Sequence, residues 1–272
     1  MKMLAKQHKK EFHLYLRSRN FSCKPLKELI FPKRVIYRMG SETKTEDITR
    51  FQVALEINSP EACHISGDKI LTKKRFTAGD IKTAEWFTVN KNDVNGESIK
   101  SHLALWETPI IVKHIHSSKG NGIYLINSIE DLYNTEDLNN ALGTKEIEKY
   151  VFERYYTYTK EYRIHVNRER CFFATRKMLK NEADIRWHRH AENAVFIHQD
   201  NPLFEKPENW DEITKECINA LKAIGLDFAA FDVKVSKKGK FIILESNSAP
   251  ALGEKSLEAY KQELTRYINE RL

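Results

Sequence analysis

Two apolar segments joined by a short polar turn constrain the fold of this chain more than any other feature. The segment FAAFDVKV at 228–235 is followed by SKKGK and then by FIILE at 241–245. Apolar runs on either side of a glycine-containing turn predict a β-hairpin, which would place Asp232 and Glu245 close together across the ladder. With Asn247 beside them, the two carboxylates form an oxygen-only pattern that suits Mg²⁺. The alternative is a solvated hairpin with incidental acids.

The composition is that of an ordinary folded protein. The chain has 272 residues, of which 41% are hydrophobic and 11% aromatic, so it can bury a substantial core in one large domain or two lobes. Aliphatic stretches such as 241–244 are too short to cross a bilayer, and the start MKMLAKQHKKEF lacks the apolar core of a signal peptide. We therefore expect a cytoplasmic protein without a membrane partner. Its four cysteines form no C-x-x-C pair, which predicts reduced thiols rather than disulfides or a zinc site.

Positive charge is concentrated at the start of the chain. Residues 1–20 contain six lysines and arginines against one acid, a net +5 out of the total of +7. Such a basic arm can bind DNA or RNA through phosphate contacts, although a charged terminal segment is more often simply solvated. Because no recognisable nucleic-acid module follows the arm, nucleic-acid binding is the less favoured interpretation.

Helical and strand-like patterns alternate along the chain. Short apolar or alternating segments predict strands at 34–38, 83–89, 109–114, 122–126, 150–154, 162–166 and 171–178. A helix is expected to begin at Asn58 or Ser59 and to lead to Asp68-Lys69, and others are expected at 129–142, at 209–225 and from Ser256 onward. The helix at 209–225 has the clearest signals: Asn209 and Glu212 have capping-box spacing, and a glycine ends it. One face of this helix carries Ile213, Cys217, Leu221 and Ile224.

A lysine followed by a serine- and glycine-rich segment indicates a phosphate-binding loop. Lys113 ends an apolar strand, HIHSSKGNG follows at 114–122, and a second apolar strand comes next. Such a loop can cover phosphates with backbone N–H groups and hydroxyls while the lysine supplies charge. It is neither a Walker loop nor a Rossmann fingerprint, because no helix follows Gly122. Taken alone, the pattern is more typical of a flexible hairpin.

The whole set of motifs resembles the ATP-grasp superfamily, especially its carboxylate–amine ligases, such as the ribosomal-protein glutamate ligase, D-alanine–D-alanine ligase and compact ligases of phages and bacteria. The resemblance covers about residues 55–253. In chain order it rests on Asp68-Lys69, Lys113, the serine–glycine hairpin, Glu153, Glu161-Tyr162-Arg163, Arg176-Lys177, Asp232, Glu245 and Asn247. It implies an α+β fold of two lobes whose antiparallel sheets clamp ATP, with a reduced N-terminal segment.

The resemblance also implies a division of the chain. The basic arm and the reduced segment would occupy 1–75, a lid lobe with the phosphate hairpin would occupy 76–152, and a C-terminal lobe with the magnesium site would occupy 153–272. In this arrangement the nucleotide lies between the second and third parts.

Roles for single residues follow from the same resemblance. ATP would contact two lysines, the hairpin, the segment 153–155 and the acid that binds the ribose hydroxyls (Glu161). The residues are Lys69, Lys113, Ser117, Ser118, Gly120, Gly122, Glu153, Arg154, Tyr155 and Glu161. Backbone groups of 153–155 would read the adenine edge. Arg163 and Arg176 would be catalytic residues that point toward the γ-phosphate. One or two Mg²⁺ ions, with Mn²⁺ as an alternative, would bind to Asp232, Glu245 and Asn247.

Four further residues are candidates for the acceptor pocket. By similarity to the compact ligases, these are Arg38, His188, His190 and Asn193. A solvated loop is the alternative for the two histidines. Their H-x-H spacing can also bind a metal, but no third ligand follows at useful spacing, so we do not expect a metal there.

The predicted activity is ATP-dependent ligation of a carboxylate to an amine through an acyl phosphate. Small molecules or peptides would supply both groups, and a protein acceptor is an alternative. The second hypothesis is an ATP-binding protein whose basic arm docks DNA or RNA. We also expect Asp232→Ala and Glu245→Ala to stop ATP turnover without harming the fold, because each removes one of two repelling acids.

Overall fold

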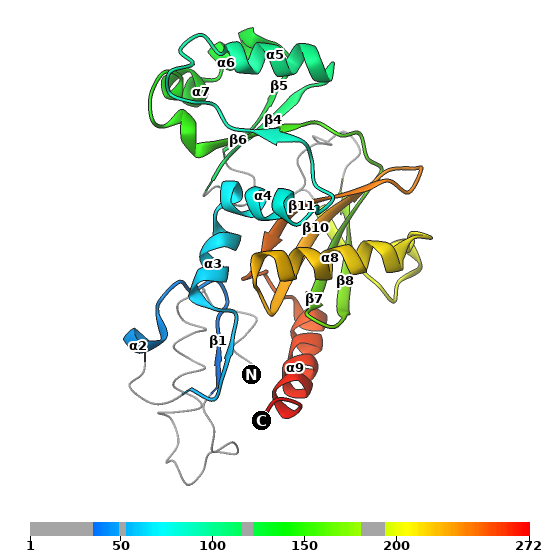
Figure 1. The fold of residues 1–272 in the computed structure, drawn as a ribbon. Coiled ribbons are helices and arrows are strands. Elements are labelled where there is room, and N and C mark those ends of the chain that lie inside the picture. Colours follow the sequence, from blue (N-terminus) through cyan, green and yellow to red (C-terminus); the bar gives the residue numbers. More distant parts are fainter. Residues whose placement is uncertain (1–34, 49–52, 116–121, 181–193) are drawn as a thin grey trace.

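The computed structural model describes residues 35–48, 53–115, 122–180 and 194–272. It contains a five-stranded sheet, a four-stranded sheet and a two-stranded pair (Figure 1). Several predictions concern residues outside these ranges, namely the basic arm at 1–20, Ser117, Ser118, Gly120, His188, His190 and Asn193. Among the described helices, none combines the length and the apolar character that a bilayer crossing requires.

The five-stranded sheet forms the larger lobe and is antiparallel throughout, in the order β11-β10-β7-β8-β9. Its strands are β7 (Lys160–Asn167), β8 (Cys171–Leu179), β9 (Ala194–His198), β10 (Phe228–Val235) and β11 (Phe241–Asn247). The predicted hairpin is confirmed, since β10 pairs with β11 and Asp232 lies directly opposite Glu245. The register shifts after this pair, as Val233 faces Ile243. Irregularities of this kind often re-aim side chains beside functional sites.

Helix α8 (Trp210–Ile224) covers one face of this sheet (Figure 1). Its predicted apolar side is confirmed, because Ile213, Cys217 and Leu221 are fully buried against the sheet. Gly225 ends the helix with a φ of 91°, a conformation that favours glycine. The predicted capping box is wrong. The side-chain amide of Asn209 donates to Glu212 and to the carbonyl of Gly239, so it ties the helix to the β10–β11 turn.

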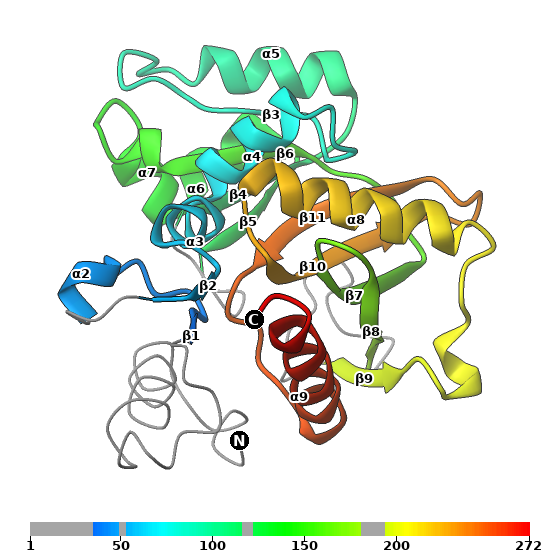
Figure 2. The ribbon, with the colours of Figure 1, turned by 60° about the horizontal axis from the view of Figure 1, so that its bottom comes forward.

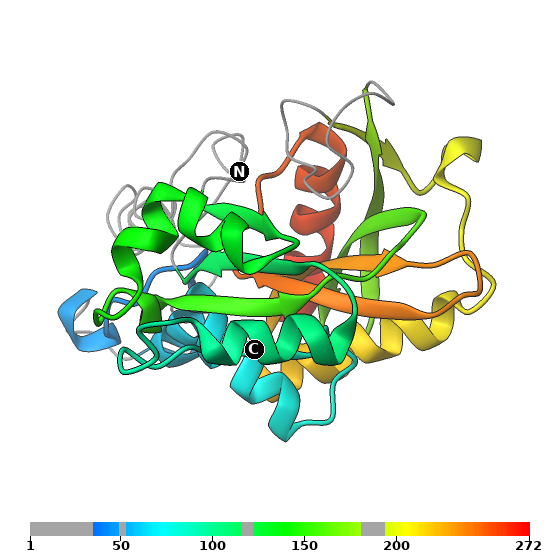
Figure 3. The same ribbon diagram turned by 90° about the horizontal axis from the view of Figure 1, so that it is seen from above.

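The opposite face of the sheet is partly covered by α9 (Glu254–Asn269). Figure 3 shows α8 and α9 on opposite sides of β10 and β11. Tyr260 of α9 is fully buried and packs against Phe228 and Tyr37, in a cluster that joins the helix to the parallel pair of β1 (Val35–Tyr37) and β2 (Leu55–Ile57). A short helix, α2 (Thr45–Ile48), lies beside this pair.

Asn58 fastens the two-stranded pair to the larger lobe. The sequence left Asn58 and Ser59 as alternative helix caps, and the structure gives that role to Ser59, which accepts from the N–H of Ala62. Asn58 adopts a φ of 62° and is fully buried. Its amide oxygen accepts from the N–H groups of Asp227 and Phe228, and its amide nitrogen donates to the Phe228 carbonyl. Three of its side-chain hydrogen bonds therefore hold the two parts together, and the amide nitrogen also donates to the Arg38 carbonyl at 3.0 Å.

The smaller lobe is a four-stranded antiparallel sheet in the order β3-β6-β4-β5. Its strands are β3 (Trp86–Phe87), β4 (Ile110–His114), β5 (Ile123–Ile126) and β6 (Tyr150–Arg154). Its helices are α5 (Glu97–Trp106), α6 (Ile129–Asn134) and α7 (Glu136–Ala141), with the single turn η3 (Ile147–Lys149) before β6. The predicted helix at 129–142 is thus divided in two. Thr135 adopts an extended backbone between the halves.

Two consecutive helices connect the lobes. Helix α3 (Pro60–Gly67) ends where the sequence predicted, and the unpredicted helix α4 (Lys69–Ala78) begins immediately afterwards. The carboxylate of Asp68 starts α4 by accepting from the N–H groups of Ile70 and Leu71. Helix α4 packs against α8, β11 and β6, so it lies between the two sheets (Figure 2). The last short element, η4 (Pro202–Phe204), leads from β9 toward α8.

Candidate active site

Charged side chains gather on the face of the five-stranded sheet that α8 does not cover. Side chains alternate along a strand, so Glu161 and Arg163 of β7 share one face, while Tyr162 points into the core beneath α8. Arg163 lies opposite Asp232 on the next strand, and Asp232 lies opposite Glu245. A transverse row of charged residues therefore crosses three strands.

Asp232 is the centre of this row. Its carboxylate accepts from Nε and Nη2 of Arg163 at 2.8 and 2.9 Å, and from Nζ of Lys177 at 2.5 Å. Lys177 also donates to Glu161 at 2.9 Å. Burial alone would raise the pKa of Asp232, but Arg163 and Lys177 hold it well below its usual range. The sequence interpretation of two mutually repelling acids is therefore wrong for Asp232, which touches two cations.

Lys177, not Arg176, faces this site. Lys177 pairs with Glu161 across the ladder, whereas Arg176 pairs with Tyr162 on the opposite face. The guanidinium of Arg176 donates to the Leu203 carbonyl at 2.8 Å and lies 3.0 Å from Glu205. The structure contradicts the prediction that Arg176 acts beside Arg163. Strand alternation within 171–178 is the signal that separates the two neighbours.

A second charged group lies on the smaller lobe. Glu153 of β6 is buried and accepts from Nζ of Lys113 at 2.9 Å, while Nζ of Lys73 lies at 3.5 Å. Burial would raise the pKa of Glu153, but Lys113 and Lys73 lower it. Burial lowers the pKa of Lys73 to about 8 against the opposing effect of Glu153. The sequence interpretation missed Lys73, although it lies one helical turn after Lys69 and so on the same side of α4.

The two charged groups meet at α4 and β10. Lys69 donates to the Ile115 carbonyl at 3.4 Å. Burial lowers its pKa, and the charge of Glu245 in the other lobe opposes that shift. Lys234 of β10 lies 4.0 Å from the ring centroid of Tyr158, in the segment that joins the sheets. Among the described residues the site thus contains six cations and four carboxylates, namely Lys69, Lys73, Lys113, Arg163, Lys177, Lys234, Glu153, Glu161, Asp232 and Glu245.

Three predicted contact residues have other partners. Arg38 is fully buried, where it donates to Thr45 at 2.9 Å and pairs with Glu56, so its side chain holds the β1–β2 corner and faces no open surface. The backbone N–H groups of Arg154 and Tyr155 donate to carbonyls of the same lobe, at 2.9 and 3.0 Å. These two donors are therefore already used and do not face a purine. The geometry contradicts the substrate role of Arg38.

Gly122 is the part of the predicted phosphate hairpin that lies within the described residues. It has a φ of 67°, which favours glycine, and its carbonyl accepts from the N–H of His114 at 3.1 Å. Gly122 therefore closes the base of the loop between β4 and β5. Residues 116–121 of the loop lie outside the described residues, so its phosphate contacts stay a prediction.

The oxygen donors at the end of the row fit a hard divalent cation. Asp232 and Glu245 are cross-strand neighbours, and the Asn247 amide donates to Glu245 at 3.3 Å. The lowered pKa of Asp232 keeps that carboxylate ionised at neutral pH. Two carboxylates and an amide carbonyl form a donor set typical of Mg²⁺, and Mn²⁺ accepts the same ligands. Within the described ranges, no group of three or more His, Cys, Asp or Glu side chains offers another metal site.

A surface hollow of about 650 Å³ lies elsewhere, between the start of β8 and α8. It is lined by Cys171, Phe204 and Trp210 together with charged side chains, and none of the ten charged groups of the site lines it. Burial raises the pKa of the Cys171 thiol to about 12, so this thiol is unreactive at neutral pH. The candidate site is therefore the charged group between the sheets, which is separate from this hollow.

Comparison with known proteins identifies the fold. No family model and no curated protein matches the chain. Among solved structures, the ATP-grasp ligase PsnB complexed with a minimal precursor matches with a TM-score of 0.53 at 19% identity, over 74% of this chain and 58% of that one. D-alanine–D-alanine ligase from Bacillus anthracis matches with a TM-score of 0.57 at 17% identity, over 77% and 66%. D-alanine–D-alanine ligase from Coxiella burnetii matches with a TM-score of 0.56 at 16% identity, over 76% of this chain and 56% of that one.

The chain has the ATP-grasp fold. The predicted α+β architecture with two antiparallel sheets is confirmed. The chain spans 56–66% of the length of these three ATP-grasp proteins. In this ATP-grasp fold, the charged side chains come from both sheets and from α4, which packs between them.

Proposed function

We propose that this protein is an ATP-dependent ligase that joins a carboxylate to an amine. The observation that carries the proposal is the charged site between the two sheets: Lys69, Lys73 and Lys113 on one side, and the Asp232–Glu245 pair with Arg163 and Lys177 on the other. Cations beside paired carboxylates suit phosphoryl transfer, because this reaction depends on positioning the phosphates and neutralising their charge.

ATP phosphates would bind where carboxylates now satisfy the cations. Lys113 and Lys73 share Glu153, and Lys177 is shared by Glu161 and Asp232. Each ammonium group has three donors, so it can keep a carboxylate partner and still contact a phosphate oxygen. Burial lowers the pKa of Lys73 to about 8, and a bound phosphate would oppose this shift by favouring the charged ammonium group.

Asp232, Glu245 and Asn247 would hold one or two Mg²⁺ ions, as their oxygen donors fit this cation. When bound, Mg²⁺ would neutralise phosphate charge and orient the γ-phosphoryl group. Arg163 keeps Asp232 ionised and fixes its orientation through two hydrogen bonds. Two of the comparison proteins were seen with the corresponding ligands: D-alanine–D-alanine ligase with ATP, and PsnB with Mg and ADP.

The chemistry proceeds in two displacements. A carboxylate oxygen of the substrate bonds to the γ-phosphorus, and the bond from that phosphorus to the β–γ bridging oxygen breaks, so ADP leaves with the electron pair. The amine nitrogen then bonds to the acyl carbon, phosphate leaves, and the nitrogen loses a proton. Arg163 and Lys177 would stabilise charge on the transferred group. Closure of the lobes would exclude water, which would otherwise hydrolyse the acyl phosphate.

Calorimetry of Mg-ATP binding tests the nucleotide site. We expect Lys69→Met to raise the Kd roughly 10- to 100-fold, because it removes a charge-assisted phosphate contact worth about 1.5–3 kcal/mol. The matched control is Lys74→Met, on the same helix but exposed to solvent, and its Kd should equal that of wild type. No Mg-ATP binding by wild type, or equal Kd values for both variants, would contradict the proposal.

A second assay tests the ligase reaction. Phosphate release from Mg-ATP is measured in the presence of pooled amino acids and peptides, and the masses of the products are determined by mass spectrometry. A ligase gives substrate-dependent release and a product lighter by one water than its two parts. Release that is the same with and without every pool would indicate a simple ATPase.

A further inference from the structure

The transverse row that contains the metal-binding candidates continues beyond Arg163. Arg163 lies opposite Thr175 on β8, and Thr175 lies opposite His198 on β9. The complete row therefore runs Glu245, Asp232, Arg163, Thr175 and His198 across all five strands. Its first two members are carboxylates, its centre is a guanidinium, and its far end is a hydroxyl beside an imidazole.

Two polar atoms at the far end have no hydrogen-bond partner among the described residues. These are Oγ1 of Thr175 and Nδ1 of His198, both shielded from solvent. The Thr175 side chain as a whole is only 5% exposed. A buried polar atom without a hydrogen-bond partner lowers the stability of the fold by about 1–3 kcal/mol. Two such atoms side by side on adjacent strands therefore require an explanation. A ligand that completes both hydrogen bonds is such a reason.

The surroundings of these atoms favour a negatively charged group. Burial lowers the pKa of His198, and the charge of Lys255 at the start of α9 lowers it further against the opposing effect of exposed Asp200. Arg163, whose guanidinium also pairs with Asp232, lies at the inner side, 5.8 Å from the ring centroid of Phe196. The Thr175 hydroxyl can donate, and so can Nδ1 of His198 in one tautomer. A carboxylate accepts from both, whereas an ammonium group has no acceptor for either donor.

We propose that Thr175 and His198 form the subsite that binds the substrate carboxylate. The inference rests on the proposed ligase function and deepens it by placing the acid on β8 and β9. Neighbouring strands lie about 4.8 Å apart, so a carboxylate over Thr175 is one strand from Arg163 and two from Asp232. This spacing would bring the attacking oxygen close to a γ-phosphoryl group that contacts Arg163. The rest of the acid would extend over His198 and Phe196.

NMR of the histidine side chains tests the subsite without knowledge of the natural acid. The full chain, labelled with ¹⁵N-histidine, is titrated with acetate at constant ionic strength, and the His198 imidazole signal is identified by its loss in His198→Gln. We expect a saturable shift of this signal. Thr175→Val should weaken the apparent acetate affinity about tenfold, and Thr175→Ser, which keeps the hydroxyl, should restore it to within about threefold.

The matched control is Thr108→Val, which removes another shielded hydroxyl without a partner, in the smaller lobe. It should leave the acetate titration unchanged. Three results would overturn the proposal: no response of the His198 signal to acetate, an equal response to chloride, or the same acetate affinity in Thr175→Val as in wild type. If a buried water satisfies both atoms instead of a ligand, the first of these results is expected.

The Kd for Mg-ATP, measured on the same Thr175→Val sample, should stay within about twofold of wild type because the subsite lies beyond the nucleotide. If the wild-type protein does not bind Mg-ATP, the ligase proposal itself is refuted. The failures of the two proposals are thus distinguishable.

Discussion

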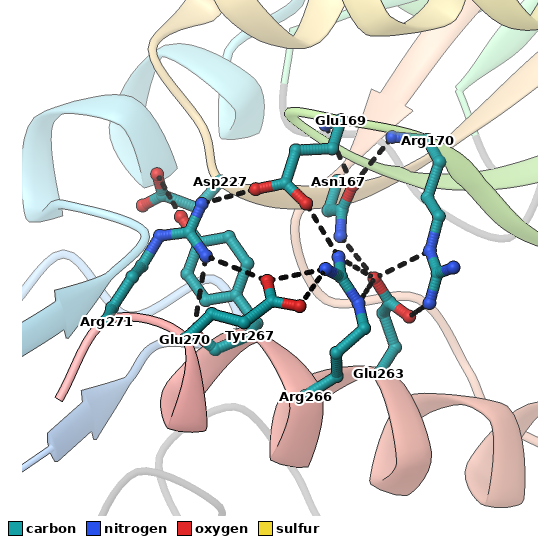
Figure 4. A network of polar contacts seen from close by, with 9 residues as sticks. All are labelled: Asn167, Glu169, Arg170, Asp227, Glu263, Arg266, Tyr267, Glu270 and Arg271. Carbon is teal, nitrogen blue, oxygen red and sulfur yellow. Dashed lines mark hydrogen bonds and ion pairs between the residues drawn. The ribbon is translucent and has the colours of Figure 1, made fainter.

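Two networks of ion pairs in this protein look alike in composition but differ in burial. The first is the charged site between the sheets. The second, which we call the α9 network, ties α9 to the β7–β8 turn, and Figure 4 shows its members. These are Asn167, Glu169, Arg170, Asp227, Glu263, Arg266, Tyr267, Glu270 and Arg271.

In the α9 network Glu263 is buried, but its arginines and the other glutamates are partly exposed. Arg266 lies 2.7 Å from Glu169 and 2.5 Å from Glu270, yet its side chain is 28% exposed. Arg271 approaches Glu169 at 2.5 Å and is 30% exposed. Exposed pairs are screened by water and salt and contribute about 0–1 kcal/mol each. In the site, by contrast, Asp232 and Lys177 are 4% and 5% exposed. The two networks therefore differ in where their cations lie: Lys177 of the candidate site is 5% exposed, whereas Arg266 and Arg271 are partly exposed.

The largest expected difference concerns the removal of one carboxylate from each network. Asp232→Ala leaves the largely buried Arg163 without its carboxylate partner and leaves Lys177 with Glu161 alone, so we expect the free energy of unfolding to fall by about 3–5 kcal/mol. Glu270→Ala in the α9 network should cost roughly 0.5 kcal/mol or less. Urea denaturation measures both. Equal costs would show that burial does not separate the networks. The expectation from sequence that Asp232→Ala leaves the fold unharmed is replaced by this one.

The next effect is the pH dependence of stability. Burial, together with the charge of Arg163, lowers the pKa of His165 from its ordinary value of 6.5 to about 3, against the opposing effect of Asp232. Between these pH values the unfolded chain binds a proton that the folded chain rejects, so His165 contributes full stability above pH 6.5 and loses it as the pH falls. We expect the free energy of unfolding to fall by about 2 kcal/mol more between pH 7.5 and 5 in wild type than in His165→Asn.

The control for this pH series is His64→Asn, since the His64 ring is 54% exposed. Its pH dependence between 7.5 and 5 should match that of wild type. If the His165→Asn protein loses as much stability as wild type on acidification, His165 is not the source of the acid sensitivity.

The smallest effect belongs to the α9 network alone. Arg271→Met removes a partly exposed pair with Glu169 and should lower the free energy of unfolding by about 1 kcal/mol or less, with a smaller loss in high salt. The Kd for Mg-ATP should not change, because the network lies away from the charged site. A change in nucleotide affinity would mean that the α9 network acts on the site.

The sequence predicted the elements that depend on local patterns. The β10–β11 hairpin follows from apolar runs around a glycine-containing turn, and α8 follows from its apolar stripe and its terminal glycine. Helix α4 was missed because Asp68, read as the end of one helix, is the cap of the next. Arg176 was misassigned because the alternation of the strand was not carried through to each residue.

By itself, the sequence determined the hairpin that pairs Asp232 with Glu245, the apolar face of α8, and the order of charged residues that resembles ATP-grasp ligases. Only the tertiary structure decided which cation meets which acid. Lys73 and Glu153 come together because α4 packs against β6, and Thr175 joins Arg163 through the β7–β8 pairing. The physical reason is that periodicity and turn signals act over a few residues, while burial and charge depend on contacts between segments distant in the chain.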